Sequence, residues 1–295
     1  MQDATLRSSR FLPAALIIAT TFMTGATIHA IGAPVSFSAQ AAPANPDAGA
    51  LVKGALARIG GKAWTEITSY ESIATVQSPM GDGRIEFRFV APDARKLVQT
   101  MPGGKTALEL GSVGGTAWMG EPGRARAVDP RMAEELAGGG DLLTLVRSID
   151  SRFADFTLLG KEAVDGVECW KISMRPLQSP TPDVRWTLLL AASDMTIVGL
   201  EIPAPPKDAA SNAPVQDGQS MRFRSWEPVE RPAATAGTAS SPVPLLAFRE
   251  ASVTTAGMKV DLSYSRVAVD TLAKGAIAAP AEIEPAPSRT SPARP

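Results

Sequence analysis

The chain has 295 residues, of which 44% are hydrophobic, and its 29 basic and 30 acidic residues leave a formal net charge of -1. Such a balanced composition offers no basic face for the phosphates of nucleic acid, so a nucleic-acid partner is excluded. The 25 glycines and 25 prolines favour strands joined by many turns over a helical bundle.

The beginning of the chain has the order of a secretory signal peptide. Arg7 and Arg10 precede an apolar run over residues 11–23, and small residues follow up to position 41. The apolar run is too short and too interrupted to span a bilayer core of about 30 Å comfortably as a permanent helix. We therefore predict a signal peptide over residues 1–41 and a spacer over residues 42–46, with an uncleaved anchor as the alternative. The expected location is the periplasm, with secretion as the alternative.

A single β domain is expected after the signal peptide, at residues 47–284, because about 250 residues suit one large β fold. Cys169 is the sole cysteine, so no lipid-acceptor cysteine follows the apolar run and no internal disulfide can form. A helix should open the domain, because Asp47 supplies an N-cap and Gly60-Gly61 a stop. The apolar stripe of this helix is Leu51, Val52, Ala55, Leu56 and Ile59.

Alternating apolar and polar residues predict a series of strands after this helix. Ile85, Phe87 and Phe89 alternate with charged residues, and the same period of two recurs at three later places. Glycine-containing turn signals between such runs predict hairpins, for which an antiparallel meander is the simplest topology. The later apolar sets are Trp170, Ile172 and Met174; Met221 and Phe223; and Val260, Leu262 and Tyr264.

Two short helices are predicted to interrupt the strands. Asp129-Pro130 begins one that carries Met132 and Leu136, and Asp141 begins the other. The glycines at 138–140 between them predict either the hinge of a movable cover over the sheet or a plain connector. The apolar residues of the second helix are Leu142, Leu145, Val146 and Ile149.

Three segments lack the pattern of regular structure. Residues 204–218 and 228–244 are rich in proline, alanine and serine, and we expect them to be exposed loops inserted between strands. The tail over residues 285–295 is expected to be disordered.

Most catalytic chemistry is excluded by residue type. The only histidine, His29, lies in the export segment, so the rest of the chain lacks the usual general base and the commonest metal ligand. Gly103-Gly104-Lys105-Thr106 imitates the end of a phosphate-binding loop, but Gln99 stands where that motif needs glycine, and a hairpin turn is favoured. Cys169, beside Trp170 in a strand, is interpreted as a core thiol rather than a nucleophile.

Large apolar groups on alternating strand positions are unusually frequent. A wide sheet covered by only three short helices can curl into a half barrel that its cover does not fill, leaving an apolar hollow of ligand size. For any single residue, an ordinary packed core is an equally good explanation. The predicted fold is mainly β with a few helices (α+β), a curved antiparallel sheet forming an incomplete β-barrel covered by short helices. The residues expected to line the hollow are Phe87, Phe89, Trp118, Trp170, Trp186 and Leu188 on the sheet, and Leu142 and Leu145 on the cover.

The succession of these features carries a family resemblance. Strands at 69–76, 83–90 and 96–101 are followed by a glycine turn leading to tryptophan at 114–118, then by the two helices and a returning hairpin at 155–174. This order and spacing resembles the periplasmic outer-membrane lipoprotein carrier family, which has the LolA/LolB-like fold. The resemblance spans most of the chain after the signal peptide.

The resemblance implies a curved sheet that shelters acyl chains, either of a lipid or of an acylated lipoprotein, without catalysis, cofactor or metal. It also implies an envelope membrane complex as a partner to consider. One position departs from the family, which keeps an arginine before the proline that ends the second strand, where it fastens the cover shut. This chain has Ala91 there. Without a lipid-acceptor cysteine, the chain is more similar to the family's soluble shuttle than to its membrane-anchored receptor.

The sequence leaves two other functions open. A structural or adhesive envelope module would have a packed interior and use its proline-rich loops for contacts. A carboxylate-based hydrolase would need two acids in one cleft, one of them with a raised pKa. Glu134-Glu135, or Asp150 with Asp155, could be offered for that role, but solvated surface and helix-start charges are the favoured interpretation.

Overall fold

The computed structural model describes residues 46–101, 103–130, 141–177, 184–204, 218–232 and 244–285. Several expectations concern residues outside these ranges and stay predictions. They are the signal peptide, nearly all of the spacer, the helix with Met132 and Leu136, the glycine hinge, most of both inserted loops and the tail after Pro285.

The described residues contain thirteen strands in one sheet. Every neighbouring pair is antiparallel, and the order across the sheet is β6-β5-β4-β3-β2-β1-β13-β12-β11-β10-β9-β8-β7. The sheet is open, because β6 and β7 lie at opposite edges. The strands are β1 (Ser69–Gln77), β2 (Gly83–Val90), β3 (Ala94–Thr100), β4 (Thr106–Val113), β5 (Thr116–Glu121), β6 (Arg124–Ala127), β7 (Phe153–Val164), β8 (Val167–Pro176), β9 (Trp186–Ala191), β10 (Ile197–Ile202), β11 (Gln219–Pro228), β12 (Leu246–Thr255) and β13 (Met258–Val269).

The topology is two meanders joined at the centre, which differs from the single meander expected from the sequence. Strands β1 to β6 run from the middle of the sheet to one edge, and β7 to β13 run back from the other edge. The halves meet where β13 pairs with β1, so that Tyr70 lies opposite Val269. A single meander would place β7 beside β6. It does not form because the chain between β6 and β7 supplies helices that pack across the sheet.

Four short helices accompany the sheet in the described residues: α1 (Ala48–Arg58), η1 (Gly61–Thr65, a 3-10 helix), α3 (Leu142–Arg147) and α4 (Ile149–Arg152). The predicted starts of α1 and α3 are confirmed. The Asp47 carboxylate accepts a hydrogen bond from the backbone N–H of Ala50 at 2.9 Å, and Asp141 accepts one from Thr144 at 3.1 Å. No helix of the described part combines the length and apolar character needed to span a bilayer.

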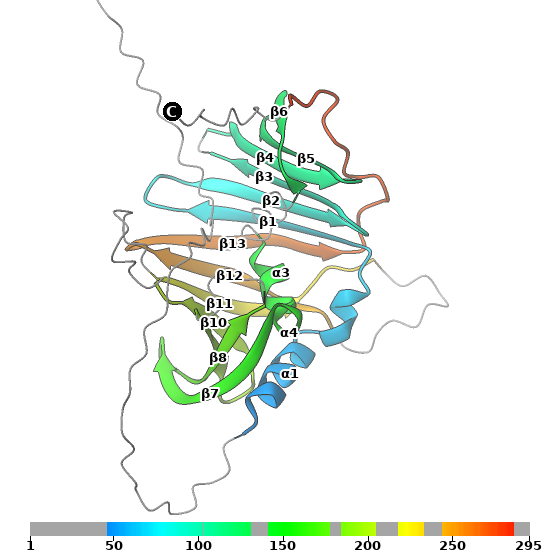
Figure 1. Cartoon of the computed structure of the whole chain (residues 1–295). Coiled ribbons are helices and arrows are strands. Elements are labelled where there is room, and N and C mark those ends of the chain that lie inside the picture. The colour runs from blue at the N-terminus through cyan, green and yellow to red at the C-terminus, as the bar shows by residue number, and fades with distance from the viewer. Residues whose placement is uncertain are drawn as a thin grey trace, which may run out of the picture.

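The sheet bends because several strands carry an extra residue. Ser265 is the unpaired residue of β13 opposite the Ile73–Ala74 step of β1, and Leu159 is the unpaired residue of β7. An extra residue on one strand bends it and increases its local twist. Figure 1 shows the resulting curved sheet, with α3 and α4 lying in front of its β10–β13 part and α1 beside β7. The expectation of an incomplete barrel with a helical cover is confirmed.

The convex face of the sheet, away from the helices, is held by ion pairs between strands. Buried Glu71 on β1 lies 2.9 Å from the Arg88 guanidinium on β2 and 3.3 Å from that of Arg266 on β13. On β3 and β4, the Lys96 ammonium lies 3.0 Å from the Glu109 carboxylate. These charges occupy the polar positions of the alternation, so this wet face follows directly from the sequence pattern.

The segment after β13 covers another part of the convex face. Ile277 is buried against Trp118, Val90 and Ala94, in a cluster separate from the main core. Further along, Glu284 pairs in parallel with Arg126 on the edge strand β6. The end of the domain therefore covers both the face and the outer edge of the β1–β6 half.

Candidate ligand-binding site

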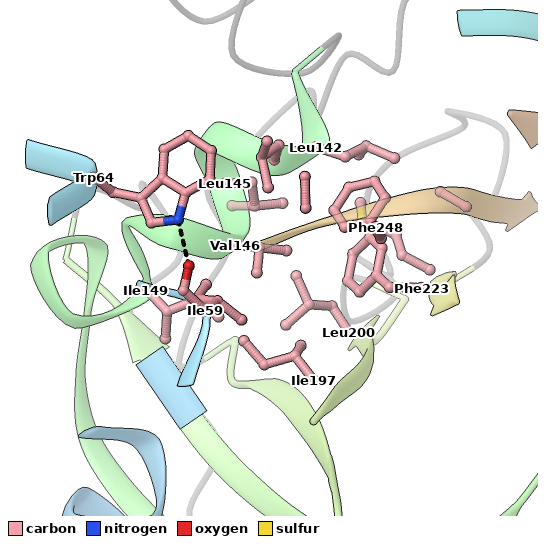
Figure 2. Close-up of a cluster of buried hydrophobic side chains, with 14 of the residues drawn as sticks. Ile59, Trp64, Leu142, Leu145, Val146, Ile149, Ile197, Leu200, Phe223 and Phe248 are labelled. Atoms are coloured by element: carbon pink, nitrogen blue, oxygen red, sulfur yellow. Dashed lines mark hydrogen bonds between the residues drawn. The ribbon is translucent and has the colours of Figure 1, made fainter. Parts of the chain in front are cut away.

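One half of the concave face is closed by tight packing, and we call the concave side of β8–β13 the packed half. Figure 2 shows Leu142, Leu145, Val146 and Ile149 of the cover helices directed at side chains of the sheet. The side chains that they meet include Ile197, Leu200, Phe223 and Phe248. The packed half leaves no room for a ligand in this state, because its central residues are 0% exposed. These are Ile172, Met174, Leu188, Leu190, Ile197 and Leu200.

Trp64 anchors the cover to the middle of the sheet. Its indole N–H donates to the backbone carbonyl of Ile59 at 2.7 Å, as the dashed line in Figure 2 shows. Its ring meets the Tyr70 ring edge-on at 6.3 Å between centroids. The Arg147 guanidinium lies 5.5 Å from the Trp64 ring and 5.7 Å from the Tyr70 ring, and it donates to the Trp64 carbonyl. These contacts tie α3, η1 and β1 together.

The other half of the concave face is less completely covered. Residues directly opposite each other on neighbouring strands share a face, so Phe89 follows Tyr70 onto the concave side. The same register brings Ile85, Leu108 and Met119 to this side, on β2, β4 and β5. All four apolar side chains are only half-buried, whereas Phe87, Leu97 and Leu110 on the same side of β2–β4 are buried. We call Ile85, Phe89, Leu108 and Met119 the open floor.

A buried polar group lies at the border between the packed half and the open floor. Asp141, at the start of α3, has its Oδ1 atom 3.5 Å from the Tyr70 hydroxyl of β1. Tyr264, on the adjacent strand β13, interacts electrostatically with the Asp141 carboxyl group. We call Asp141, Tyr70 and Tyr264 the polar centre.

Burial dominates the electrostatics of the polar centre. It raises the pKa of the Asp141 carboxyl above its ordinary value, against the opposing effect of the Arg147 charge and the hydrogen bonds from Thr144. Burial, and secondarily the charge of Asp141, also raises the pKa of both tyrosines. Both phenols are therefore neutral hydroxyl groups at physiological pH.

The structure brings four of the predicted site residues together. Phe87 lies in the main core with its ring 5.8 Å from that of Tyr70, and Phe89 lies beside it on the open floor. Leu142 and Leu145 belong to the cover, as expected, and both are buried. All four belong to or pack against the main hydrophobic core, and Phe87 and Phe89 lie beside Tyr70 of the polar centre.

Three other predicted residues lie in or near the packed half. Leu188 is fully covered there, and the Trp186 ring packs 5.1 Å from the Phe153 ring. Trp170 is half-buried near the β7 edge, with the Lys161 ammonium 4.4 Å from its ring centroid. In this state these side chains contribute to the packed interior rather than to an open surface.

Trp118 differs from the expectation, because it lies on the opposite face of the sheet. Its neighbours Ala117 and Met119 point to the concave side, so the alternation directs Trp118 to the convex side. There it lies under Ile277, and its indole N–H donates to Glu109 at 3.2 Å. Sequence reasoning identified the strand but could not tell which of its two faces the helices would cover.

Sequence reasoning missed the polar centre. It identified Asp141 only as a helix start and Tyr264 only as an apolar strand residue. One signal was available, because the chain has only two tyrosines and both stand within segments predicted as strands. Pairing β1 with β13 brings them under one carboxylate, and that pairing is not encoded locally.

Other candidate groups do not form a reaction centre. Cys169 is buried on the convex side with Val164 and Leu189, and burial raises the pKa of its thiol, as suits a core residue. Residues 103–104 form the turn between β3 and β4, as expected for a hairpin. Asp155 is engaged by the Arg175 guanidinium at 2.6 Å. In the described ranges, no three His, Cys, Asp or Glu side chains are grouped as a metal would require.

A shallow depression of about 140 Å³ lies on the convex side of β11–β13. Its lining mixes charged side chains and serines with Ala251 and Leu262, so it does not suit a purely hydrocarbon ligand. Its charged lining is Arg222, Arg224, Glu250 and Asp261.

No family model and no curated protein matches this chain. Solved structures do: a LolA superfamily protein from Nitrosomonas europaea aligns over 80% of this chain and 99% of its own, with a TM-score of 0.50 and 10% identity. A DUF1329 family protein from Desulfovibrio piger aligns over 77% and 95%, with a TM-score of 0.46 and 14% identity. The Mycobacterium tuberculosis lipoprotein LppX aligns over 77% and 98%, with a TM-score of 0.30 and 13% identity. The expected resemblance is thus confirmed at the level of fold: this chain has the open, helix-covered antiparallel sheet of LolA superfamily proteins.

Proposed function

We propose that this protein is an exported, non-catalytic carrier or sensor that shelters the acyl chains of a lipid or lipoprotein on its open floor. One observation carries the proposal. On a single concave face, the central side chains of the packed half are fully buried while the four side chains of the open floor are only half-buried. Hydrocarbon laid on that floor would bury apolar surface on both partners, at about 0.8 kcal/mol per methylene.

The fold and the family resemblance support this choice of ligand. This chain shares the fold of a LolA superfamily protein, and its apolar concave face lies beneath short helices. Export is supported by the signal-like order of residues 1–41, and a periplasmic location would place the protein beside lipid and lipoprotein cargo.

The rival functions have less support from the described residues. A structural module with a packed interior accounts for the packed half, but leaves the half-buried Ile85, Phe89 and Met119 without a purpose. A hydrolase would need a second carboxylate beside Asp141. Within the described part of the chain, the groups that act on the Asp141 carboxyl are two arginines, Thr144 and two tyrosines, none of them a carboxylate.

Two measurements test the carrier proposal. Protein purified from its native envelope should yield lipid in organic extracts analysed by mass spectrometry, and the delipidated protein should bind a pyrene-labelled alkyl probe. Met119→Lys, which places a charge on the open floor, should weaken probe binding by about tenfold or more.

Val98→Lys is the matched control. Val98 is half-buried on the adjacent sheet region but faces the convex side between Glu86 and Glu109, so the new charge is accommodated and probe binding should stay unchanged. Absence of lipid in repeated extracts, together with no probe binding, would refute the carrier function. Equal loss in both variants would place the binding surface elsewhere.

A further inference from the structure

The polar centre contains a buried carboxylate oxygen that receives no hydrogen bond in the described part of the protein. Asp141 is only 2% exposed, and its Oδ1 atom accepts the backbone N–H of Thr144 and faces the Tyr70 hydroxyl. Its Oδ2 atom is buried and has no hydrogen-bond partner in the described part of the protein. A buried carboxylate oxygen without a hydrogen-bond donor lowers the stability of the folded state. Binding of a ligand that supplies the missing donor would therefore be favoured.

The role of Asp141 in helix capping does not explain this second oxygen. Asn, Ser or Thr would cap α3 with one side-chain oxygen at similar stability. Of the two arginines whose charge acts on Asp141, Arg147 has the larger effect, but its side chain donates to the Trp64 carbonyl at 3.2 Å and to the Thr144 hydroxyl at 3.1 Å. Its guanidinium also covers the rings of Trp64 and Tyr70.

The position of the polar centre connects it to the open floor. Tyr70 lies opposite Phe89 across the β1–β2 pair, and its ring is 5.8 Å from the Phe87 ring. Tyr264 lies opposite Ala74 on the other side of β1 and contacts Phe248 of the packed half. A chain on the open floor would meet the polar centre at its end nearest β1, where α3 begins. Farther along the floor it would pass Arg95, which lies over the Phe89 ring, and Gln99, which lies between Ile85 and Leu108.

We propose that Asp141 Oδ2 accepts a hydrogen bond from the hydroxyl or ammonium head of an amphiphile whose hydrocarbon chain lies on the open floor. This assignment rests on the proposed carrier function and adds the head-group class. The two neutral tyrosine hydroxyls can accept or donate a further bond to such a head. Heads that only accept hydrogen bonds, such as carboxylate, would face Asp141 with the wrong chemistry.

Competition with the pyrene-labelled alkyl probe tests this assignment at neutral pH. Hexadecanol and hexadecylamine should displace the probe at concentrations about tenfold lower than hexadecyl methyl ether, which has a similar chain but no donor. In Asp141→Asn, where an amide can still cap α3, the preference of alcohol over ether should fall to about one. Asp150→Asn, which removes an exposed carboxylate from the first turn of α4, is the control and should keep the preference.

The outcomes separate this inference from the carrier function. If alcohol, amine and ether displace the probe equally from the unaltered protein, the head-group assignment is wrong while the carrier function stands. If the preference survives in Asp141→Asn, another group recognises the head. If neither the probe nor any of the amphiphiles binds, the carrier function itself fails. The comparison of alcohol and amine with ether in the unaltered protein tests the head-group assignment even if Asp141→Asn does not fold.

Discussion

The two halves of the concave face differ in how completely the chain covers them. In the packed half, cover helices and strands interdigitate, and six central side chains are fully buried. In the β2–β5 half the same alternation faces inward, but four of its apolar side chains, those of the open floor, stay half-buried. The strand pattern is equivalent in both halves, so coverage, not sequence pattern, distinguishes a structural core from a candidate binding surface. Four substitutions test this contrast.

The largest expected effect is in the packed half. Leu200→Ala removes a fully buried side chain beneath the cover helices and should lower the free energy of unfolding by about 3 kcal/mol. Urea denaturation measures the loss. Probe binding by the folded variant should change little, and a loss below about 1 kcal/mol would show that this half is not tightly packed.

A second effect concerns the convex face. A methyl group added at Gly111 would lie 2.2 Å from Cζ2 of Trp118, so Gly111→Ala should cost about 2 kcal/mol through overpacking. The double variant Gly111→Ala with Trp118→Leu should recover part of that loss, as a thermodynamic cycle would measure. Because this contact lies on the face opposite the open floor, these variants should bind the probe with unchanged affinity even where their stability is reduced.

The polar centre should make stability depend on pH. The pKa of Asp141 is raised by burial above its ordinary value of 3.8, so the folded protein holds this proton at pH values where the unfolded chain has lost it. Stability should therefore fall as pH rises from the ordinary to the raised pKa, by at most about 1.4 kcal/mol per pH unit, and level off above it. Asp141→Asn lacks this contribution, so the difference between the two urea-denaturation profiles should follow that curve. A difference that is constant with pH would contradict the assignment.

The smallest effect on stability is expected on the open floor. Ile85→Ala should cost no more than about 1 kcal/mol, because the side chain is only half-buried, yet it should weaken probe binding measurably. Val98→Ala, on the adjacent strand and the convex face, should cost a similar amount without affecting binding. Loss of stability comparable to that of Leu200→Ala would show that the floor is core, and the contrast between the halves would disappear.

Much of the fold was predictable because its signals are local. The alternation in residues 83–90 produced β2 with the same bounds, and the caps at Asp47 and Asp141 marked the starts of two helices correctly. The candidate site was predictable only in part. Phe87 and Phe89 lie on the concave face of the sheet and Leu142 and Leu145 on the cover, whereas Trp118 faces the opposite side. That these residues line a ligand site stays a prediction.

By itself, the sequence indicated several of the strands with their polar and apolar sides, the starts of α1 and α3, and the absence of histidine after position 29. These depend on residue type and on spacing within a few positions. Only the tertiary structure decided that β13 pairs with β1, that the helices cover one face and the C-terminal segment the other, and that two tyrosines meet one buried carboxylate. Such contacts join residues more than seventy positions apart, and they depend on the packing of the whole sheet rather than on any local pattern.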